Sequence, residues 1–329
     1  MSIDVATQRR GLPLHVTLEN CSGGTFIVTG ANTGLGLEAA KHLVAVGAAK
    51  VIMGVRNLEA GETAKAGIES ATGKTGVAQV WKIDLSSYDS VKAFAKKAIA
   101  ELDRVDALIE NAAVAMSERV LAEGHALPIT VNVLSTFLLA ALMLPKLRDD
   151  AKKFDILPHI TIVSSSVSFG YEEQWNLIKD DPIAKADDES MVTLMLYPLS
   201  KLMEILAVKH IASQIPVSST GVVLNLVCPG LCITDLSRNA PPAFKEQIAI
   251  QHRQVGRTAE DGSRTLLHGA VAGKKSHGCL LAACEIATQQ QPSWLEGDKG
   301  QHAQKRVWDD IAKELESVEP GCVSEILQQ

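Results

Sequence analysis

Short apolar runs alternate with longer segments of helical periodicity from residue 25 almost to the end of the chain. β-Branched and aliphatic residues fill the short runs, which predicts strands that are buried on both faces. The predicted strands are 25–29, 50–55, 77–83, 107–109, 159–163 and 222–227, with a candidate seventh at 278–283. Helices are expected at 37–47, 58–71 and 87–103, after residue 113, and around Tyr197. This order predicts an α/β fold: a doubly wound, Rossmann-type parallel sheet of six to seven strands with helices on both faces.

The same alternation predicts the domain organisation. It extends over 25–320 and predicts a single domain, preceded by a polar arm at 1–24 and followed by a tail at 321–329. Two stretches depart from the rhythm, because 170–192 is acidic and 231–257 contains two consecutive prolines. Each follows the carboxyl end of a predicted strand, where open α/β sheets bind ligands. We interpret both as loops that cover a substrate; the alternative is that they are solvated insertions.

The most hydrophobic helical stretch covers 131–144 and is predicted to stop at Pro145. About 14 residues are too few to span a bilayer, so we expect no membrane span but a helix buried in the protein or at a subunit contact. Residues 1–18 lack the apolar core of a signal peptide. The six cysteines are scattered, without a Cys-x-x-Cys pair. These features predict a reduced, cytoplasmic protein.

Charge and histidine content narrow the classes of partner. A formal net charge of −6, with no long run of Lys and Arg, argues against binding to nucleic acid. The cysteine and histidine spacings do not match a zinc site, so we expect no bound metal. His159, His210 and His277 are instead expected to cap or pack.

A glycine-rich turn follows the first predicted strand, with glycines at 30, 34 and 36. Glycine lets the backbone approach a diphosphate closely, and the start of the next helix offers unpaired N–H groups and a partial positive charge. Because the turn joins the first strand to the first helix, it predicts a dinucleotide-binding site.

Tyr197 and Lys201 lie four residues apart at the start of an apolar helical segment, so their side chains share one face. A nearby ammonium lowers the pKa of a phenol, which would make Tyr197 a proton donor or acceptor at physiological pH. The pair alone is more typical of a surface tyrosine beside a solvated lysine. Pro198 suits only the first turn of a helix, and therefore predicts a helix that starts later than usual.

Together these motifs resemble the short-chain dehydrogenase/reductase (SDR) family over about residues 24–318. The matching segments are Thr29–Gly36, Asp84-Leu85, Glu110–Ala113, Asn132, Ser164-Ser165, Tyr197 with Lys201, and Pro229-Gly230 with Thr234. The resemblance implies cofactor contacts by Gly30, Asn32, Thr33, Gly34, Leu35, Gly36, Asp84, Leu85, Asn111, Ala112, Tyr197, Lys201, Pro229, Gly230 and Thr234. It implies catalysis by Ser165, Tyr197, Lys201 and Asn132.

The resemblance also implies a role for each catalytic residue. Tyr197 would give its proton to the developing alkoxide, and Ser165 would donate a hydrogen bond to the same oxygen. Lys201 would lower the tyrosine pKa and hold the nicotinamide ribose, while Asn132 would position a water. Ser164 and Ser166 flank Ser165, so the assignment of the catalytic serine can slip by one residue.

Three positions refine this expectation. Glu110 replaces an asparagine of the family motif, and Ala113 replaces a glycine, where its methyl group is expected to crowd the nicotinamide ribose or shift the backbone. At the end of the second strand, Arg56 takes the place of the acidic residue that NAD-specific members use. Arg56 can pair with a 2′-phosphate, which predicts NADP(H); alternatively it stacks on adenine or points to solvent.

The resemblance is nearest to the retinol-dehydrogenase-like and fungal branch of the family. The features that suggest this branch are Asn32–Gly36, Arg56-Asn57, Lys305–Trp308 and the long interval between Ser165 and Tyr197. It implies NADP(H)-dependent hydride transfer between nicotinamide and a ketone or secondary alcohol of a hydrophobic or aromatic small molecule, in secondary metabolism. The alternative is a non-redox enzyme of this fold, for cyclisation, dehydration or epimerisation, or an NADP-sensing binding protein. The family also suggests a homodimer or homotetramer through the fourth and fifth helices, unless long insertions block it.

Overall fold

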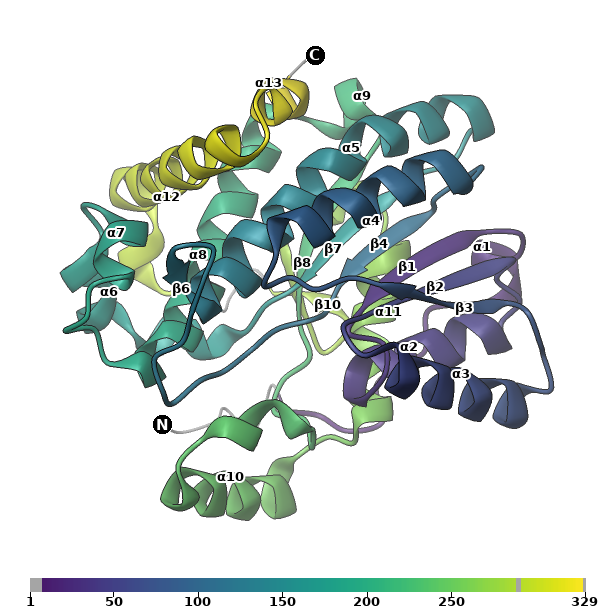
Figure 1. Cartoon of the computed structure of the whole chain (residues 1–329), viewed down its shortest axis with the longest axis horizontal. Helices are drawn as coiled ribbons and strands as arrows, with labels where there is room; N and C mark the ends of the chain where they lie inside the picture. Colours follow the sequence, from purple (N-terminus) through teal and green to yellow (C-terminus); the bar gives the residue numbers. More distant parts are fainter. Residues whose placement is uncertain (1–7, 288–290, 328–329) are drawn as a thin grey trace.

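The computed structural model describes residues 8–287 and 291–327, so residues 1–7 of the predicted arm and 328–329 of the predicted tail lie outside the described residues. Eight strands form one sheet in the order β10-β9-β8-β7-β4-β1-β2-β3 (Figure 1). Neighbouring strands are parallel except β9 and β10. The strands are β1 Thr25–Thr29, β2 Lys50–Val55, β3 Ala78–Lys82, β4 Ala107–Glu110, β7 His159–Val163, β8 Val223–Cys228, β9 Leu280–Ala282 and β10 Glu285–Ile286. The predicted α/β fold is confirmed, with the six predicted strands and the candidate seventh present, and β10 adds an eighth that was not predicted.

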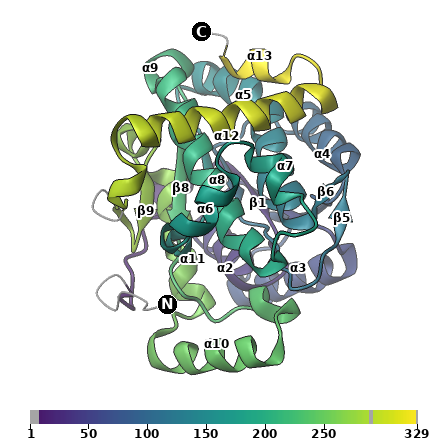
Figure 2. The same ribbon diagram turned by 90° about the vertical axis from the view of Figure 1, so that its left-hand side faces the viewer.

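Helices cover both faces of the sheet (Figure 1). One face packs against α2 Gly34–Ala45, α3 Leu58–Thr72 and α11 Ala259–Val271. The other packs against α4 Tyr88–Glu101, α5 Ser135–Phe154 and α8 Thr193–Gln214. Outside these, α12 Gly297–Val318 lies along α8, and α13 Cys322–Leu327 lies on α5 (Figure 2). Residues 322–327 of the predicted tail therefore form a helix, which packs into the hydrophobic core that α4, α5 and α8 share.

The hydrophobic helix at the centre of the protein does not stop at Pro145. A π-helical turn, η1 Ile129–Leu134, leads into α5, which continues through Pro145 to Phe154. Proline inside a helix costs about 3 kcal/mol, and fully burying two leucines contributes about that much or more. Leu144 and Leu147 are both buried beside it. The combined helix of 26 residues is long and apolar enough to cross a bilayer, but 83% of its most apolar window is buried, as in a core helix.

The helix that carries Tyr197 also differs from the prediction. α8 begins at Thr193, four residues before the tyrosine, and Pro198 lies inside it. The proline removes one backbone donor, but α8 is buried on nearly all sides, and Leu199 and Leu202 are fully buried. The helix therefore starts earlier, not later, because packing outweighs the local preference.

Both predicted substrate loops contain helices. The segment 170–192 forms α6 Glu172–Ile178 and α7 Pro182–Ala186, anchored by buried Trp175 and Ile183. The segment 231–257 forms η3 Asp235–Asn239 and α10 Pro242–Val255. α10 has no buried residue and projects from the body of the protein (Figures 1 and 2). The remaining elements are α1 Leu18–Cys21, β5 Leu121–Ala122, β6 His125–Ala126, η2 Ser166–Gly170, α9 Val217–Thr220, η4 Lys274–Ser276 and η5 Ser293–Leu295.

Candidate active site

The three serines after β7 face different partners. The hydroxyl of Ser164 donates to the backbone oxygen of Lys201 at 3.0 Å. The hydroxyl of Ser166 lies 3.4 Å from the sulfur of Cys228. Ser165 forms the hydrogen bond to the side chain of Tyr197. The geometry therefore favours Ser165, as predicted, over its two neighbours.

Tyr197 and Lys201 share one face of α8, as their spacing predicts, with the lysine Nζ 5.9 Å from the centre of the tyrosine ring. Lys201 is only 3% exposed. Its Nζ donates to the backbone oxygen of Val163 at 2.8 Å and to Oε1 of Glu204 at 2.7 Å. The sequence analysis missed Glu204, although its position three residues after Lys201 places it on the same helix face.

The predicted fall in the pKa of Tyr197 is wrong for this structure. Burial raises that pKa, the negative charge of Glu204 raises it further, and the hydrogen bond with Ser165 opposes both. The carboxylate of Glu204 sits on the ammonium of Lys201 and so offsets the cation that was expected to favour the phenolate. Tyr197 therefore stays protonated at physiological pH, as a proton donor must.

Asn132 lies in the π-helical turn η1, and its side chain is fully buried. Its Oδ1 accepts from the backbone nitrogen of Val114 at 2.9 Å, and its Nδ2 donates to the oxygen of the same residue at 3.0 Å. Nδ2 also donates to the hydroxyl of Ser200 at 3.0 Å. The amide thus ties the segment after β4 to α8, next to Tyr197 and Lys201.

The glycine turn is packed against the end of β4. Gly30 has φ +66°, in the left-handed region, and a Cβ there would lie 3.1 Å from Cα of Ala112. A Cβ at Gly36 would lie 2.5 Å from the side-chain nitrogen of Asn111, which donates to the backbone oxygen of Thr29 at 2.8 Å. The turn, Asn111 and Ala112 are therefore brought together as predicted.

The segment after β8 approaches the same turn. A Cβ built on Gly34 would lie 3.4 Å from Cγ2 of Thr234. The backbone oxygen of Pro229 accepts from Nη1 of Arg257 at 2.5 Å. Gln8 accepts from the backbone nitrogen of Leu231 at 3.0 Å. Arg257 and Gln8 hold this segment in place, and the sequence analysis missed both because they are distant in the chain.

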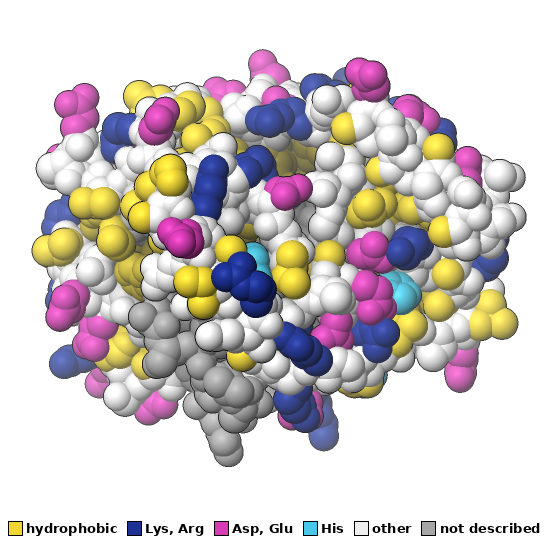
Figure 3. Space-filling model, turned by 90° about the horizontal axis from the view of Figure 1, so that it is seen from below, with side chains coloured by type: hydrophobic (Ala, Val, Ile, Leu, Met, Phe, Trp, Pro, Cys, Tyr) yellow, Lys and Arg dark blue, Asp and Glu magenta, His cyan; other side chains and the backbone are white. Residues whose placement is uncertain are grey.

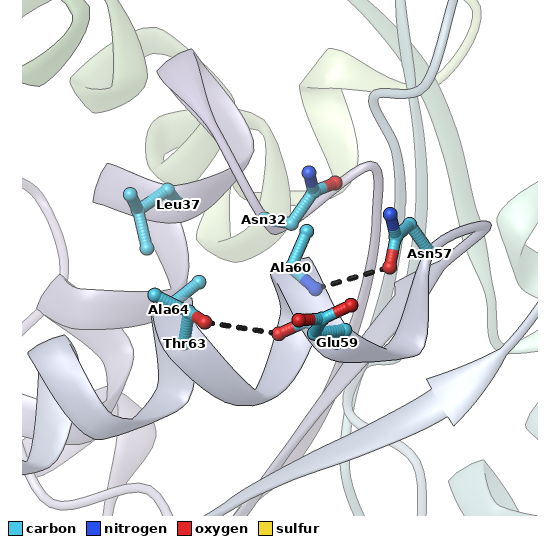
Figure 4. A pocket seen from close by; sticks show the side chains of 7 residues that line it. All are labelled: Asn32, Leu37, Asn57, Glu59, Ala60, Thr63 and Ala64. Atoms are coloured by element: carbon cyan, nitrogen blue, oxygen red, sulfur yellow. Dashed lines mark hydrogen bonds between the residues drawn. The ribbon is translucent and has the colours of Figure 1, made fainter.

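Two further predicted cofactor positions, Asp84 and Leu85, lie in the segment after β3. Asp84 follows β3, and its Oδ1 accepts from the backbone nitrogen and the hydroxyl of Ser86. Leu85 is buried, and its backbone oxygen accepts from Ser135 at 2.6 Å. A shallow hollow of about 530 Å³ lies between the starts of α2 and α3, lined by Asn32, Leu37, Asn57, Glu59, Ala60, Thr63 and Ala64 (Figure 4).

Comparison with known proteins decides the family. A family model described as short chain dehydrogenase matches residues 24–174. The short chain dehydrogenase/reductase dmxR8 of Cryptosporiopsis sp. (strain 8999) is 42% identical over 93% of this chain and 94% of its own length. The chain belongs to the short-chain dehydrogenase/reductase family. It is therefore an SDR oxidoreductase that acts on small molecules, and SDR enzymes use NAD(P).

Further similarities agree with this SDR assignment. The short-chain dehydrogenase anuD of Penicillium roqueforti (strain FM164) is 33% identical over 93% of this chain and 81% of its own length. Among solved structures, a short chain dehydrogenase from Shigella flexneri 2a strain 301, complexed with NADP, superposes with a TM-score of 0.60. It is 20% identical and covers 81% of this chain and 99% of its own, a likeness that bears on the fold.

This SDR chain carries its departures from the family motif at the end of β4. Glu110 is 4% exposed, and neither of its carboxyl oxygens has a hydrogen-bond partner among the described residues. Burial raises its pKa well above the ordinary value. Ala113 is partly exposed.

Away from this site, three residues that offer metal-ligand atoms lie together, with those atoms within 4.8 Å of one another. They are His15 of the arm, His268 of α11 and Cys284 between β9 and β10. The two imidazoles stack with ring centres 4.3 Å apart, and burial together with His15 lowers the pKa of His268 to about 4. The expectation of no bound metal stays a prediction.

Proposed function

We propose that this protein is an NADP(H)-dependent reductase that converts a ketone of a hydrophobic or aromatic small molecule into a secondary alcohol. The observation that carries the proposal is the contact between Ser165 and Tyr197 beside the buried Lys201, at the same sheet edge as the glycine turn. Reduction requires a protonated donor, and the raised pKa of Tyr197 keeps it protonated.

The chain's own residues would divide the work in the following way. The chemistry that NADPH would supply when bound is a hydride for the carbonyl carbon. Tyr197 donates its proton to the carbonyl oxygen, and Ser165 donates a hydrogen bond that stabilises the charge developing there. Lys201 is held behind Tyr197 by Val163 and Glu204. The residues that would hold the cofactor are those of the glycine turn, Asp84, Leu85, Asn111, Ala112, Pro229, Gly230 and Thr234.

The preference for NADP(H) over NAD(H) rests on the end of β2. Arg56 is exposed next to the hollow that Asn57 lines, and Lys82 donates to the backbone oxygen of Arg56 at 2.6 Å. Two cations at this place suit a 2′-phosphate. Glu59 also lines the hollow and opposes them in part.

The proposed substrate class rests on the two segments that follow β7 and β8. Large apolar side chains are exposed there, namely Leu177 of α6, Ile233 just before η3, and Phe244 of α10. The named relatives come from fungi, which supports a role in fungal secondary metabolism. A cytoplasmic location and membership of the retinol-dehydrogenase-like branch remain our expectations from the sequence.

Assembly through the fourth and fifth helices meets an obstacle. Those helices are α5 and α8, and α13 and α12 of the same chain pack on them (Figure 2). Figure 3 shows a different face, seen from below the orientation of Figure 1, on which acidic and basic side chains are interspersed. We propose that the protein does not assemble through α5 and α8; a mass near 35.1 kDa by light scattering would support this.

The test follows absorbance of NADPH and NADH with a panel of aromatic and alicyclic ketones. We expect oxidation of NADPH that depends on a ketone, and its loss in Tyr197→Phe with NADPH binding retained. Arg56→Asp should raise the KM for NADPH about 10- to 100-fold, the range for a charge-assisted hydrogen bond, while Arg56→Lys loses less. NADPH binding without oxidation by any ketone would instead favour the non-redox or sensing alternative.

A further inference from the structure

Two buried carboxyl groups lie behind the proposed proton donor, and the reaction described above does not use them. Glu110, at the end of β4, is 4% exposed, and Glu204, on α8, is 1% exposed. Oε1 of Glu204 binds the ammonium of Lys201 at 2.7 Å. Oε2 of Glu204 and both oxygens of Glu110 have no hydrogen-bond partner among the described residues. Three unpaired carboxyl oxygens in one buried place are unusual in a folded protein.

The charges in this cluster do not balance if both carboxyls are ionised. Lys201 is the cation that faces them, and the charge of Glu204 acts on Glu110 directly. A single ammonium can offset one buried carboxylate, while a second ionised carboxylate would cost several kcal/mol. Burial raises the pKa of both groups, that of Glu204 to about 7 against the opposing effects of Lys201 and of a hydrogen bond with Ser164. The pair therefore keeps one proton at neutral pH, and Glu110, which has no bond to the lysine, is its carrier.

The charge that remains on Glu204 reaches Tyr197. After burial, it is the largest influence on the tyrosine pKa, and it acts in the same direction. Cys228 at the end of β8 and Cys232 after it act in the same direction, and the hydrogen bond with Ser165 opposes them. The ammonium of Lys201 meanwhile points at Val163 and Glu204.

We propose that Glu204 is a positioning residue that holds Lys201 and tunes the proton affinity of Tyr197, and that Glu110 carries the proton that lets this buried pair exist. The proposal rests on the function proposed above. As a consequence, the carboxylate of Glu204 keeps the phenol of Tyr197 protonated and favours reduction of a ketone over oxidation of an alcohol. Removing the charge frees the ammonium to act on the phenol and lowers its proton affinity.

The test needs no substrate, so it is independent of the reaction test. The chain has only three tyrosines, and tyrosinate absorbance in the near ultraviolet therefore resolves single ionisations during an alkaline titration. In Glu204→Gln we expect one tyrosine to ionise about one pH unit or more lower than in wild type, a tenfold change in proton affinity. The double variant Tyr197→Phe with Glu204→Gln should lack that early transition.

A matched control is Asp150→Asn, which neutralises another buried carboxylate paired with a lysine. It should leave the tyrosine titration unchanged. If Glu204→Gln is folded by near-ultraviolet circular dichroism and its tyrosines titrate as in wild type, the proposal is overturned. A matching shift in Asp150→Asn would also overturn it, because the effect would then be general.

A second measurement keeps the proposal testable if Glu204→Gln does not fold. A protonated carboxyl has a C=O stretching band distinct from that of a carboxylate in the infrared. Wild-type protein at about pH 8, above the pKa of about 7 of Glu204, should show this band from a group shielded from solvent, and Glu110→Gln should lose it. Absence of the band in wild type would mean that the pair holds no proton and would refute the assignment of Glu110.

Discussion

Two buried lysine–carboxylate pairs on neighbouring helices look alike and differ in how completely they are satisfied. On α5, Lys146 binds Asp150 at 3.0 Å, with side chains 10% and 4% exposed. On α8, Lys201 binds Glu204 at 2.7 Å, with side chains 4% and 1% exposed. The second oxygen of Asp150 accepts from the backbone nitrogen of Val105 at 2.8 Å. The second oxygen of Glu204 has no such partner among the described residues.

This difference in hydrogen bonding separates a structural ion pair on α5 from a functional one on α8. A pair whose oxygens are all bonded fixes a loop to a helix, as Asp150 does at the start of β4. In the pair on α8, one oxygen of Glu204 lacks a hydrogen-bond partner among the described residues and a second buried carboxyl lies nearby. The uncompensated charge can therefore change the pKa of a neighbouring group such as Tyr197. Burial alone therefore does not distinguish a structural ion pair from a functional one; the count of satisfied oxygens does.

The largest effect should separate the two lysines. Lys201→Met removes the cation beside Tyr197 and should lower kcat about 10²- to 10⁴-fold, the range for a lost contribution to proton transfer. Lys146→Met should leave kcat unchanged and lower only the melting temperature. Steady-state NADPH oxidation and thermal unfolding of both variants measure this. Equal losses of kcat would break the comparison.

An intermediate effect should appear in stability. Asp150→Ala leaves the N–H of Val105 buried without its acceptor, which costs about 1–3 kcal/mol of unfolding free energy. The expected shift is a lower urea midpoint with an unchanged slope, and with kcat as in wild type. A variant as stable as wild type would show that water replaces the carboxylate, and that the pair on α5 is less structural than its bonds suggest.

The smallest effect is a pH dependence. The folded-state pKa of Glu110 is raised above the ordinary 4.5, so its contribution to stability is complete below that pH and is lost as pH rises. The slope amounts to at most about 1.4 kcal/mol per pH unit for one proton. Glu110→Gln should remove this share, so that the variant gains stability over wild type with rising pH.

Urea titrations at several pH values measure that slope. Glu204 contributes in the same direction, with stability lost as pH rises through its folded pKa of about 7, and it is present in both proteins. The difference between wild type and Glu110→Gln therefore reports Glu110 together with its coupling to Glu204. Parallel curves would mean that Glu110 binds no extra proton in the folded state.

The sequence predicted those parts of the site whose chemistry is local. The glycine turn and the pairing of Tyr197 with Lys201 follow from short spacing and from order along the chain. Glu110 could be noted as a departure from the family motif, but its proximity to Glu204 could not, because β4 and α8 come together only in the folded protein. Pro145 and Pro198 were misjudged for a related reason: burial of the surrounding helix outweighs what a proline costs locally.

The N-terminal arm has a consequence for the order of folding. Gln8 donates to the backbone oxygens of Leu231 and Val255, which are 223 and 247 positions away along the chain. During synthesis Gln8 leaves the ribosome before residues 231–255, so its binding surface is completed only when most of the chain has been synthesised. The arm must therefore remain undocked until late, and its contacts, among the most distant in sequence, form near the end of folding.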